Sequence, residues 1–337
     1  MPKLLNVLYQ TDNNYAPQTG VSITSLCCNN TDMDEIDIYI LDDGINPDNI
    51  RRFEQLATDW GRRIHFIDTT AIKEKLISLG VEPFRGTYTT YLKLFALSDL
   101  SINSDRILQI DGDTIINQSL DPLLQIDLQG SILAATYECV QNGYKQLIGL
   151  KPTDPYYNCG VMLINLPSWQ YECCEDQIVS HLKNVRNRYF TVDQDIINVL
   201  FSNRITYLPI KYNVNSGFYI YGIDTSFWMY DLNPNVYASK DEIEDAVAHP
   251  AINHCMGPMT GRPWEIDNIH PQGPLYDQYL EKSPWRDVPK IQSKTSTLFK
   301  LQRAAYTLLP LSLYKRIHKM ILTNWLKEQN KRCLEGR

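Results

Sequence analysis

Two carboxylates separated by one residue, Asp111 and Asp113, are the side chains of this 337-residue sequence best placed for chemistry. They directly follow an apolar run at residues 106–110, which we expect to form a buried strand. A carboxylate pair at a strand end can hold a hard divalent cation, which prefers oxygen ligands and often shares them with a diphosphate. Gly112 would let the backbone approach such a ligand closely. A solvated turn is the competing explanation, because Asp-x-Asp is a common spacing.

Aspartyl-phosphate phosphatases also begin with Asp-x-Asp after a strand, but they require Thr or Val four residues after the first Asp. Ile115 occupies that position and Thr114 comes one place early, which argues against phosphatase chemistry. A second polar cluster, residues 12–14 (DNN), follows another apolar run at residues 4–9. By itself this cluster could instead cap the helix expected at residues 21–28.

Strand and helix signals alternate through most of the chain, and the resulting elements must position both clusters. This alternation predicts an α/β fold with a mostly parallel sheet covered on both faces. Ligands of such sheets bind beyond the carboxyl ends of strands, where both clusters lie. Residues 209–290, rich in Asn, Pro, Tyr and Gly, are predicted to be mostly loop. The expected strands are 4–9, 36–41, 63–67, 106–110, 132–136, 160–165 and 205–208, and the expected helices are 21–28, 47–57, 71–79, 90–97, 167–182 and 193–201.

Charge divides the chain into two parts. Residues 290–337 contain eleven Lys or Arg and two acids, a net charge of +9, whereas the remainder carries −16. The overall charge of −7 argues against a nucleic-acid binder. Eight cysteines occur, none at Cys-x-x-Cys spacing, and the first residues do not form a signal peptide. We therefore expect a cytoplasmic protein with reduced thiols.

The basic tail has helical periodicity. Apolar residues recur at helical spacing on both sides of Pro310, and Lys315, Arg316 and Lys319 occupy the opposite face. An amphipathic helix with basic and aromatic side chains suits an anionic membrane surface. A helical hairpin packed on the domain would show the same pattern. No apolar run approaches the roughly 20 residues that span a bilayer.

Five short blocks, specific only in combination, occur in order along the chain. They are residues 9–15 (YQTDNNY), 108–113 (LQIDGD), 157–165 (YNCGVMLIN), 193–198 (DQDIIN) and 254–258 (HCMGP), the last followed by Pro263-Trp264. Together they resemble glycosyltransferase family 8, the retaining sugar-nucleotide-dependent transferases, and within it the bacterial lipopolysaccharide α-galactosyl- and α-glucosyltransferases. The resemblance covers about residues 4–290 and implies a Rossmann-like nucleotide-sugar-binding fold of the GT-A type.

The resemblance implies a role for each matching residue. Asp111, Asp113 and His254 would hold Mn²⁺, or alternatively Mg²⁺. The donor would be UDP-galactose or UDP-glucose. Asp193 would bond hydroxyls of the donor sugar, and Gln194 would lie under the anomeric carbon. The implied donor-binding residues are Gln10, Asp12, Asn14, Tyr15, Lys93, Asp111, Gly112, Asp113, Glu138, Asn158, Cys159, Asp193, Gln194, Gly257 and Arg262.

Three positions depart from the family pattern. Cys159 replaces a small alanine against the sugar, and Glu138 stands where relatives carry Asp. The block after His254 is two residues longer than usual, and Arg262 takes the place of a lysine. Arginine can still grip a phosphate, and does so through two hydrogen bonds.

These observations predict a metal-dependent, retaining transferase that moves galactose or glucose to a sugar hydroxyl of a lipopolysaccharide core or another surface polysaccharide precursor. Residues 1–290 would form the catalytic domain, and residues 291–337 a basic helical tail that attaches to the inner face of the cell membrane. One alternative is a sugar-phosphate nucleotidyltransferase, but residues 9–20 lack its glycine-rich phosphate loop. The other is a non-catalytic nucleotide-sugar-binding module, which the intact candidate residues disfavour.

Overall fold

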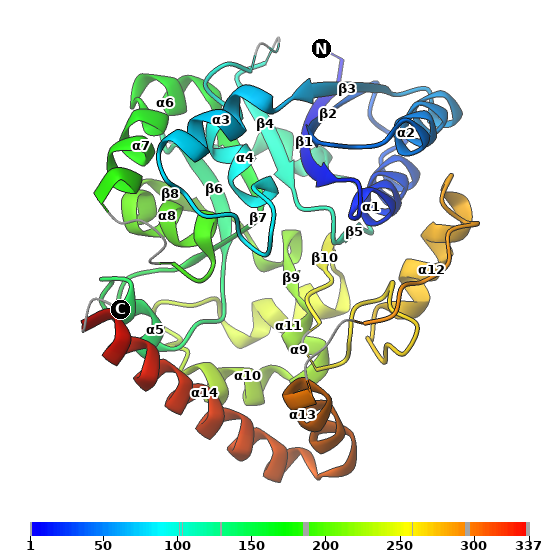
Figure 1. Cartoon of the computed structure of the whole chain (residues 1–337). Coiled ribbons are helices and arrows are strands. Elements are labelled where there is room, and N and C mark those ends of the chain that lie inside the picture. The colour runs from blue at the N-terminus through cyan, green and yellow to red at the C-terminus, as the bar shows by residue number, and fades with distance from the viewer. Residues whose placement is uncertain are drawn as a thin grey trace.

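Seven strands form the central sheet of the computed structural model, which describes residues 2–100, 102, 104–128, 130–184, 189–257, 259–293 and 297–334 (Figure 1). Their order across the sheet is β3-β2-β1-β4-β7-β6-β8. Only β7 runs antiparallel to its neighbours, so the mostly parallel sheet predicted above is confirmed. The strands are β1 (Leu4–Asp12), β2 (Glu35–Asp43), β3 (Arg63–Asp68), β4 (Arg106–Ile110), β6 (Leu133–Tyr137), β7 (Tyr157–Asn165) and β8 (Ile205–Tyr207).

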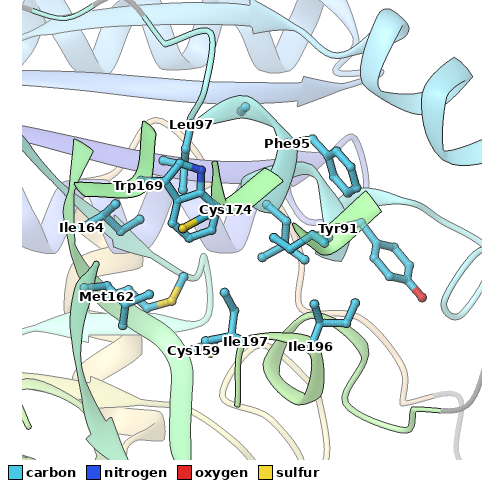
Figure 2. Packing of buried hydrophobic residues seen from close by; sticks show 14 of the residues in the cluster. Tyr91, Phe95, Leu97, Cys159, Met162, Ile164, Trp169, Cys174, Ile196 and Ile197 are labelled. Atoms are coloured by element: carbon cyan, nitrogen blue, oxygen red, sulfur yellow. The ribbon is translucent and has the colours of Figure 1, made fainter. Parts of the chain in front are cut away.

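Helices cover both faces of this sheet, because its central strands are apolar on both sides. One face packs against the cluster in Figure 2, where Trp169, Met162 and Ile196 lie among the buried side chains. The other face packs against α1 and α2 and includes the fully buried Trp285. The helices that lie between β1 and β8 along the chain are α1 (Ala16–Asn29), α2 (Pro47–Trp60), α3 (Thr70–Ser78), α4 (Thr89–Ala96), α5 (Asn142–Leu147), α6 (Leu166–Tyr171), α7 (Cys174–Asn184) and α8 (Val192–Phe201).

Two predictions about helices were wrong. The single helix expected at 167–182 is two, because Cys173 between α6 and α7 has a left-handed φ of 51°. The segment 209–290 is not mostly loop. Its described residues contain four short helices, and two of them start at a side-chain cap: Asn215 and Ser239 accept backbone N–H groups at the starts of α9 and α11. These helices are α9 (Ser216–Tyr221), α10 (Ile223–Tyr230), α11 (Lys240–Ala248) and α12 (Gly273–Lys282).

A small three-stranded sheet brings the metal-ligand candidates together. β5 (Thr114–Ile116) pairs antiparallel with β10 (Ile252–His254), which pairs in turn with β9 (Val214–Asn215). The Cys255 N–H donates to the Asp113 carbonyl at 2.8 Å. His254 therefore ends a strand and lies beside the residues that follow β4. The described residues also include three short 3₁₀ helices, at Asp121–Gln125, Ser202–Arg204 and Ile210–Tyr212.

The tail forms two helices, α13 (Thr297–Leu308) and α14 (Leu311–Leu334), which meet at Pro310. Figure 1 shows α14 running from α13 past α10 to α5, so this helix packs on the domain. Among the α14 side chains that the structure describes, Tyr314 and Leu326 are buried. Within the described residues, none of the helices has the length and apolar character needed to cross a membrane. Of the tail's charged residues, Lys294, Glu335 and Arg337 lie outside the part of the chain that the structure describes.

Candidate active site

Two adjoining cavities open where the carboxyl ends of β1 and β4 face the first turn of α8 and the end of β10. The larger encloses about 420 Å³ and the smaller about 290 Å³. Both are lined by Asp111, Asp113 and Arg262. The other predicted residues divide between them: Gln10, Asp12, Tyr15 and Gly112 line the larger cavity, and Glu138, Asn158, Cys159, Asp193, Gln194 and His254 line the smaller.

Asp111, Asp113 and His254 form a group that fits a divalent cation. Each offers one ligand atom, and the three atoms lie within 4.8 Å of one another. His254 Nδ1 lies 3.1 Å from the Asn213 side-chain oxygen, which accepts its proton and leaves Nε2 as the ligand atom. Nε2 lies 3.1 Å from Asp113 Oδ1. Two carboxylates and one imidazole suit Mn²⁺ better than Mg²⁺.

Arg262 and Tyr15 also hold Asp113. Arg262 Nη1 lies 2.6 Å from Asp113 Oδ2, and the Tyr15 hydroxyl donates to the same oxygen at 3.2 Å. Burial alone would raise the pKa of Asp113, but the charges of His254 and Arg262 outweigh burial and lower that pKa. The guanidinium of Arg262 lies over the Trp264 ring, 5.3 Å from its centre. The longer loop thus places its cation at the metal-site carboxylate.

Lys93 lies between Asp111 and Asp193 and pairs with both carboxylates. It is only 1% exposed, and its Nζ lies 3.2 Å from Asp111 Oδ1 and 2.8 Å from Asp193 Oδ2. It also donates to the Cys159 carbonyl at 2.8 Å. Burial alone would lower the pKa of Lys93, but the two carboxylates outweigh burial and raise it. Burial raises the pKa of Asp193 to about 6, although Lys93 opposes this shift.

The side-chain amide of Gln194 is held at both ends. Its oxygen accepts the Cys159 N–H at 3.1 Å, and its nitrogen donates to the Tyr156 hydroxyl at 3.3 Å. The neighbouring Asp195 is fully buried and accepts hydroxyl groups from Tyr144 and Tyr156, each at 2.6 Å. Asp195 does not line the smaller cavity that Gln194 lines, and its contacts are those of a structural residue.

Glu138 lines the smaller cavity, and both of its carboxylate oxygens accept hydrogen bonds. Asn158 donates to one oxygen, and Asn215 donates to the other at 2.7 Å. Burial raises the pKa of Glu138, although these hydrogen bonds oppose the shift. Gly160 N–H donates to the Asn158 side-chain oxygen at 2.7 Å, and a side chain at Gly160 would overlap the His254 ring. This glycine therefore makes room for the imidazole.

Three predicted donor-binding residues do not line either cavity, and one of them is Lys93, whose contacts are given above. Asn14 is exposed beyond the end of β1. Gly257 is buried, and a Cβ at this position would overlap the Gly261 carbonyl. The turn after β10 therefore has room only for glycine at residue 257. Pro258, which completes that sequence block, lies outside the described residues.

One wall of the cavities, formed by the loop before α4 and the first turn of that helix, was not predicted from the sequence. Phe84, Arg85 and Thr90 line both cavities. Arg85 and Gly86 both have left-handed φ angles, 54° and 89°. The Pro-Phe-Arg-Gly sequence at residues 83–86 was the available signal for a tight turn. Phe190 and Met256, which line the smaller cavity, carried no such signal.

The sequence of this chain is similar to those of known glycosyltransferases. The profile of the family described as Glycosyl transferase family 8 matches residues 6–267. A lipopolysaccharide 1,2-glucosyltransferase of Escherichia coli K12 is 27% identical over 310 residues, which cover 88% of this chain and 83% of that protein. A lipopolysaccharide 1,3-galactosyltransferase of Salmonella typhimurium LT2 is 26% identical over 301 residues, which cover 86% of this chain and 82% of that protein.

Two solved structures share the fold. The galactosyltransferase LgtC, in complex with donor and acceptor sugar analogs, has a TM-score of 0.65 at 25% identity and covers 88% of this chain and 99% of its own. The bifunctional glycosyltransferase WbbM in its apo form has a TM-score of 0.70 at 22% identity over 85% of this chain. The match covers 51% of WbbM, so this chain spans about half its length. The predicted GT-A type of α/β fold is confirmed.

Proposed function

The chain belongs to glycosyl transferase family 8, and from that premise we propose that it is a metal-dependent, retaining α-glycosyltransferase with a UDP-sugar donor. The proposed reaction moves galactose or glucose to a sugar hydroxyl of a lipopolysaccharide core or another surface polysaccharide precursor. The observation that carries this proposal is the Asp111–Asp113–His254 group in the cavity that Asp193 and Gln194 also line. The names of the two lipopolysaccharide transferases described above support the acceptor class.

The two cavities suggest how the donor is divided. Gln10, Asp12 and Tyr15 line the larger cavity, which would take the base and ribose. Arg262, on the shared wall, would exchange its contact with Asp113 for one with the diphosphate. Asp111, Asp113 and His254 would hold Mn²⁺, or Mg²⁺ as the less favoured ion. When bound, this ion would act as a Lewis acid that offsets charge on the departing UDP.

The smaller cavity would hold the transferred sugar. Asp193 is proposed to accept hydrogen bonds from sugar hydroxyls, with Lys93 fixing its position. Gln194 would lie under the anomeric carbon, where its amide oxygen offsets developing positive charge. A glutamine is a poor nucleophile, and the nearby Asp195 already accepts two tyrosine hydroxyls. These contacts favour attack on the face that UDP leaves.

In this scheme the acceptor oxygen forms a bond to the anomeric carbon while the bond from that carbon to the UDP oxygen breaks. The proton of the acceptor hydroxyl passes to a diphosphate oxygen of the departing UDP. The configuration is retained because entry and departure share one face, without a covalent intermediate. A glycosyl adduct trapped on Asp193, Asp195 or Glu138 would contradict this scheme.

We also propose a division into a catalytic domain, residues 1–290, and a basic tail, residues 291–337, that attaches to an anionic membrane surface. Several tail side chains support this proposal because they are apolar and exposed. Acceptors that are lipid-linked glycans would be met at the inner face of the cell membrane, which fits a cytoplasmic enzyme bound peripherally. The exposed apolar residues of α13 and α14 are Leu301, Leu308, Leu311, Leu313, Met320, Ile321 and Trp325.

A donor screen tests the proposed reaction. Purified protein is incubated with Mn²⁺ and each of UDP-galactose, UDP-glucose, UDP-N-acetylglucosamine and UDP-N-acetylgalactosamine, and UDP release is measured. We expect release from UDP-galactose or UDP-glucose and little from the N-acetylated donors. Absence of UDP release from all four donors, with and without a lipopolysaccharide-core acceptor, would overturn the proposal.

Substitution of a metal-site carboxylate separates catalysis from folding. Asp113→Ala is expected to lower Mn²⁺-dependent UDP release at least a hundredfold, because one of three protein ligands is lost. Asp245→Ala is the matched control, since the Asp245 side chain on α11 is 72% exposed. Turnover by Asp113→Ala equal to that of the control would show that this group does not hold the catalytic ion.

A further inference from the structure

The far end of α14 packs against the segment that carries the active-site residues. Leu326 is 5% exposed and lies in a cluster with Tyr144 and Tyr156. The Trp325 ring meets the Phe190 ring edge to face, with the centres 4.8 Å apart. Phe190 itself lines the smaller cavity. The C-terminal helix is thus only one side chain removed from the proposed sugar site.

The same two tyrosines hold the start of α8. Their hydroxyls donate to the two oxygens of Asp195, which also accepts the Thr191 N–H at 3.0 Å. The Tyr156 hydroxyl also accepts a hydrogen bond from the Gln194 amide nitrogen at 3.3 Å. The cluster that contains Leu326 and Tyr156 is therefore joined to Gln194 through the Tyr156 hydroxyl.

The segment between Phe190 and Gln194 depends on these neighbours for its shape. Val192, immediately before Asp193, has a φ of 21°, which L-residues rarely adopt. Such a backbone persists only where surrounding contacts fix it. Five consecutive residues of the segment, Phe190 to Gln194, line the smaller cavity, so a shift of this backbone would move Asp193 and Gln194 together.

We propose that Leu326 and Trp325 are positioning residues that hold the Phe190–Gln194 segment in its active geometry. The C-terminal helix is then part of the catalytic apparatus as well as a surface for membranes. This inference rests on the proposed function for its kinetic test, and a second measurement below is independent of it. Loss of the Leu326 side chain would leave a space in the cluster that contains Tyr144 and Tyr156, and small displacements of a catalytic group lower turnover steeply.

The kinetic test compares Leu326→Ala with Met320→Ala, a change at a 58% exposed position of the same helix. With the best donor of the screen, Leu326→Ala is expected to lower kcat about tenfold, and Met320→Ala to leave it unchanged. The dissociation constant for UDP should not change in either variant, because Gln10, Asp12 and Tyr15 lie in the other cavity. Unchanged kcat in Leu326→Ala would overturn the inference.

The stoichiometry of UDP binding shows how much of each variant is folded. UDP titration counts the folded sites, so kcat is expressed per site that binds UDP. Should Leu326→Ala fail to fold, Trp325→Ala replaces it, since Trp325 is 37% exposed. Trp325→Phe keeps a ring against Phe190 and should recover most of the turnover that Trp325→Ala loses. Equal turnover in these two variants would count against the proposal.

A double variant tests the route through Tyr156. Tyr156→Phe removes the hydroxyl that bonds both Asp195 and Gln194. If Leu326 acts through this hydroxyl, the double variant loses no more turnover than the more damaging single variant. Losses that multiply would show that Leu326 acts elsewhere, and would overturn the proposed route.

Hydrogen exchange tests the inference without any turnover. In Leu326→Ala, the amide of Thr191 should exchange at least fivefold faster than in wild type, because its bond to Asp195 loosens. In Met320→Ala the exchange should be unchanged. Unaltered exchange in Leu326→Ala would overturn the inference, whereas faster exchange in an enzyme without turnover would leave it standing and refute only the proposed function.

Discussion

Lys93 carries a charge in a place that water does not reach, between Asp111 and Asp193. Lys93→Met leaves the buried Asp193 and the partly exposed Asp111 without their cation. We expect the free energy of unfolding to fall by about 3 kcal/mol, which is typical when one partner of a buried pair is removed. UDP release should fall at least a hundredfold, because Asp193 loses its anchor. Urea unfolding and the donor assay measure the two effects.

The control for Lys93→Met is Lys75→Met, which removes a lysine whose side chain is 43% exposed and paired with Glu175. Exposed pairs contribute about 0–1 kcal/mol, so this variant should unfold close to wild type. Lys93→Arg, which retains the charge, should keep more stability than Lys93→Met. Similar unfolding midpoints for all three variants would mean that the buried charge does not stabilise this site.

Some residues of the site could be predicted from the sequence, whereas several contacts between them could not. The strand-end acid pair and the block around His254 identified the three metal-ligand candidates, which the structure brings within 4.8 Å. The link from Lys93 to Asp193 was not visible, because it joins residues a hundred positions apart through a shared cavity. The bond between Tyr156 and Gln194 was missed for the same reason.

The loop that leads from β10 to α12 contains a histidine held neutral. His270 Nδ1 accepts the Gln272 N–H at 3.1 Å, and Nε2 lies 3.1 Å from the Ser216 hydroxyl, which in turn donates to the His254 carbonyl. Burial lowers the pKa of His270 to about 4. This loop is therefore tied to α9 and to the end of β10 by a group that must stay uncharged.

Acid should weaken this attachment. The unfolded chain binds a proton at its histidine below about pH 6.5, whereas the folded chain binds it only near pH 4, so stability is complete above pH 6.5 and falls as pH decreases. The expected contribution to the loss by pH 4 is about 3 kcal/mol. His270→Gln should lose less stability over this interval, as urea unfolding between pH 7 and pH 4 will measure. Parallel pH profiles for wild type and variant would contradict this assignment.

The close approach of α1 to the segment that follows α12 depends on Gly20. A Cβ at this position would overlap the ring of Trp285, which is fully buried between α1 and α2. Gly20→Ala is expected to lower the free energy of unfolding by about 2 kcal/mol, typical of an overpacked core, despite the helix preference of alanine. Thermal unfolding measures the change.

Gly143→Ala on α5 is the matched control for Gly20→Ala, because its nearest neighbour would lie 3.7 Å from the added Cβ, an ordinary contact. This variant should unfold at or slightly above the wild-type temperature. If Gly20→Ala also unfolds there, the Trp285 ring is free to move, and its packing on α1 is not a fixed contact.

The elements of the fold differ in how far the sequence determined them. The buried strands β1, β2 and β4 and the helices between them were predictable, because a parallel sheet needs apolar strands and separate crossover helices. Residues 209–290 were not, because α9 to α12 are short, carry many tyrosines and lack a long apolar stripe. Their folding depends on the domain that they cover.

At the scale of the molecule, charge and apolar surface are concentrated on the tail. Most of the chain is acidic, and residues 290–337 are basic. Helix α14 buries one side against α5 and α10, so its remaining side, with α13, presents the exposed apolar residues given above. Both interpretations of the tail raised by the sequence can therefore hold together: the hairpin packs on the domain and still offers a face to a membrane.

We expect the full chain to sediment with vesicles that contain phosphatidylglycerol and not with neutral vesicles. Each basic side chain near an anionic surface contributes about 1 kcal/mol. Replacing the exposed Lys300 and Arg316 by Gln should therefore weaken binding by roughly thirtyfold at 0.1 M salt. The same charge change at the exposed Lys151 and Lys183, outside the tail, should leave binding unaltered. Equal weakening by both pairs would show that overall charge, and not the tail, brings the protein to the membrane.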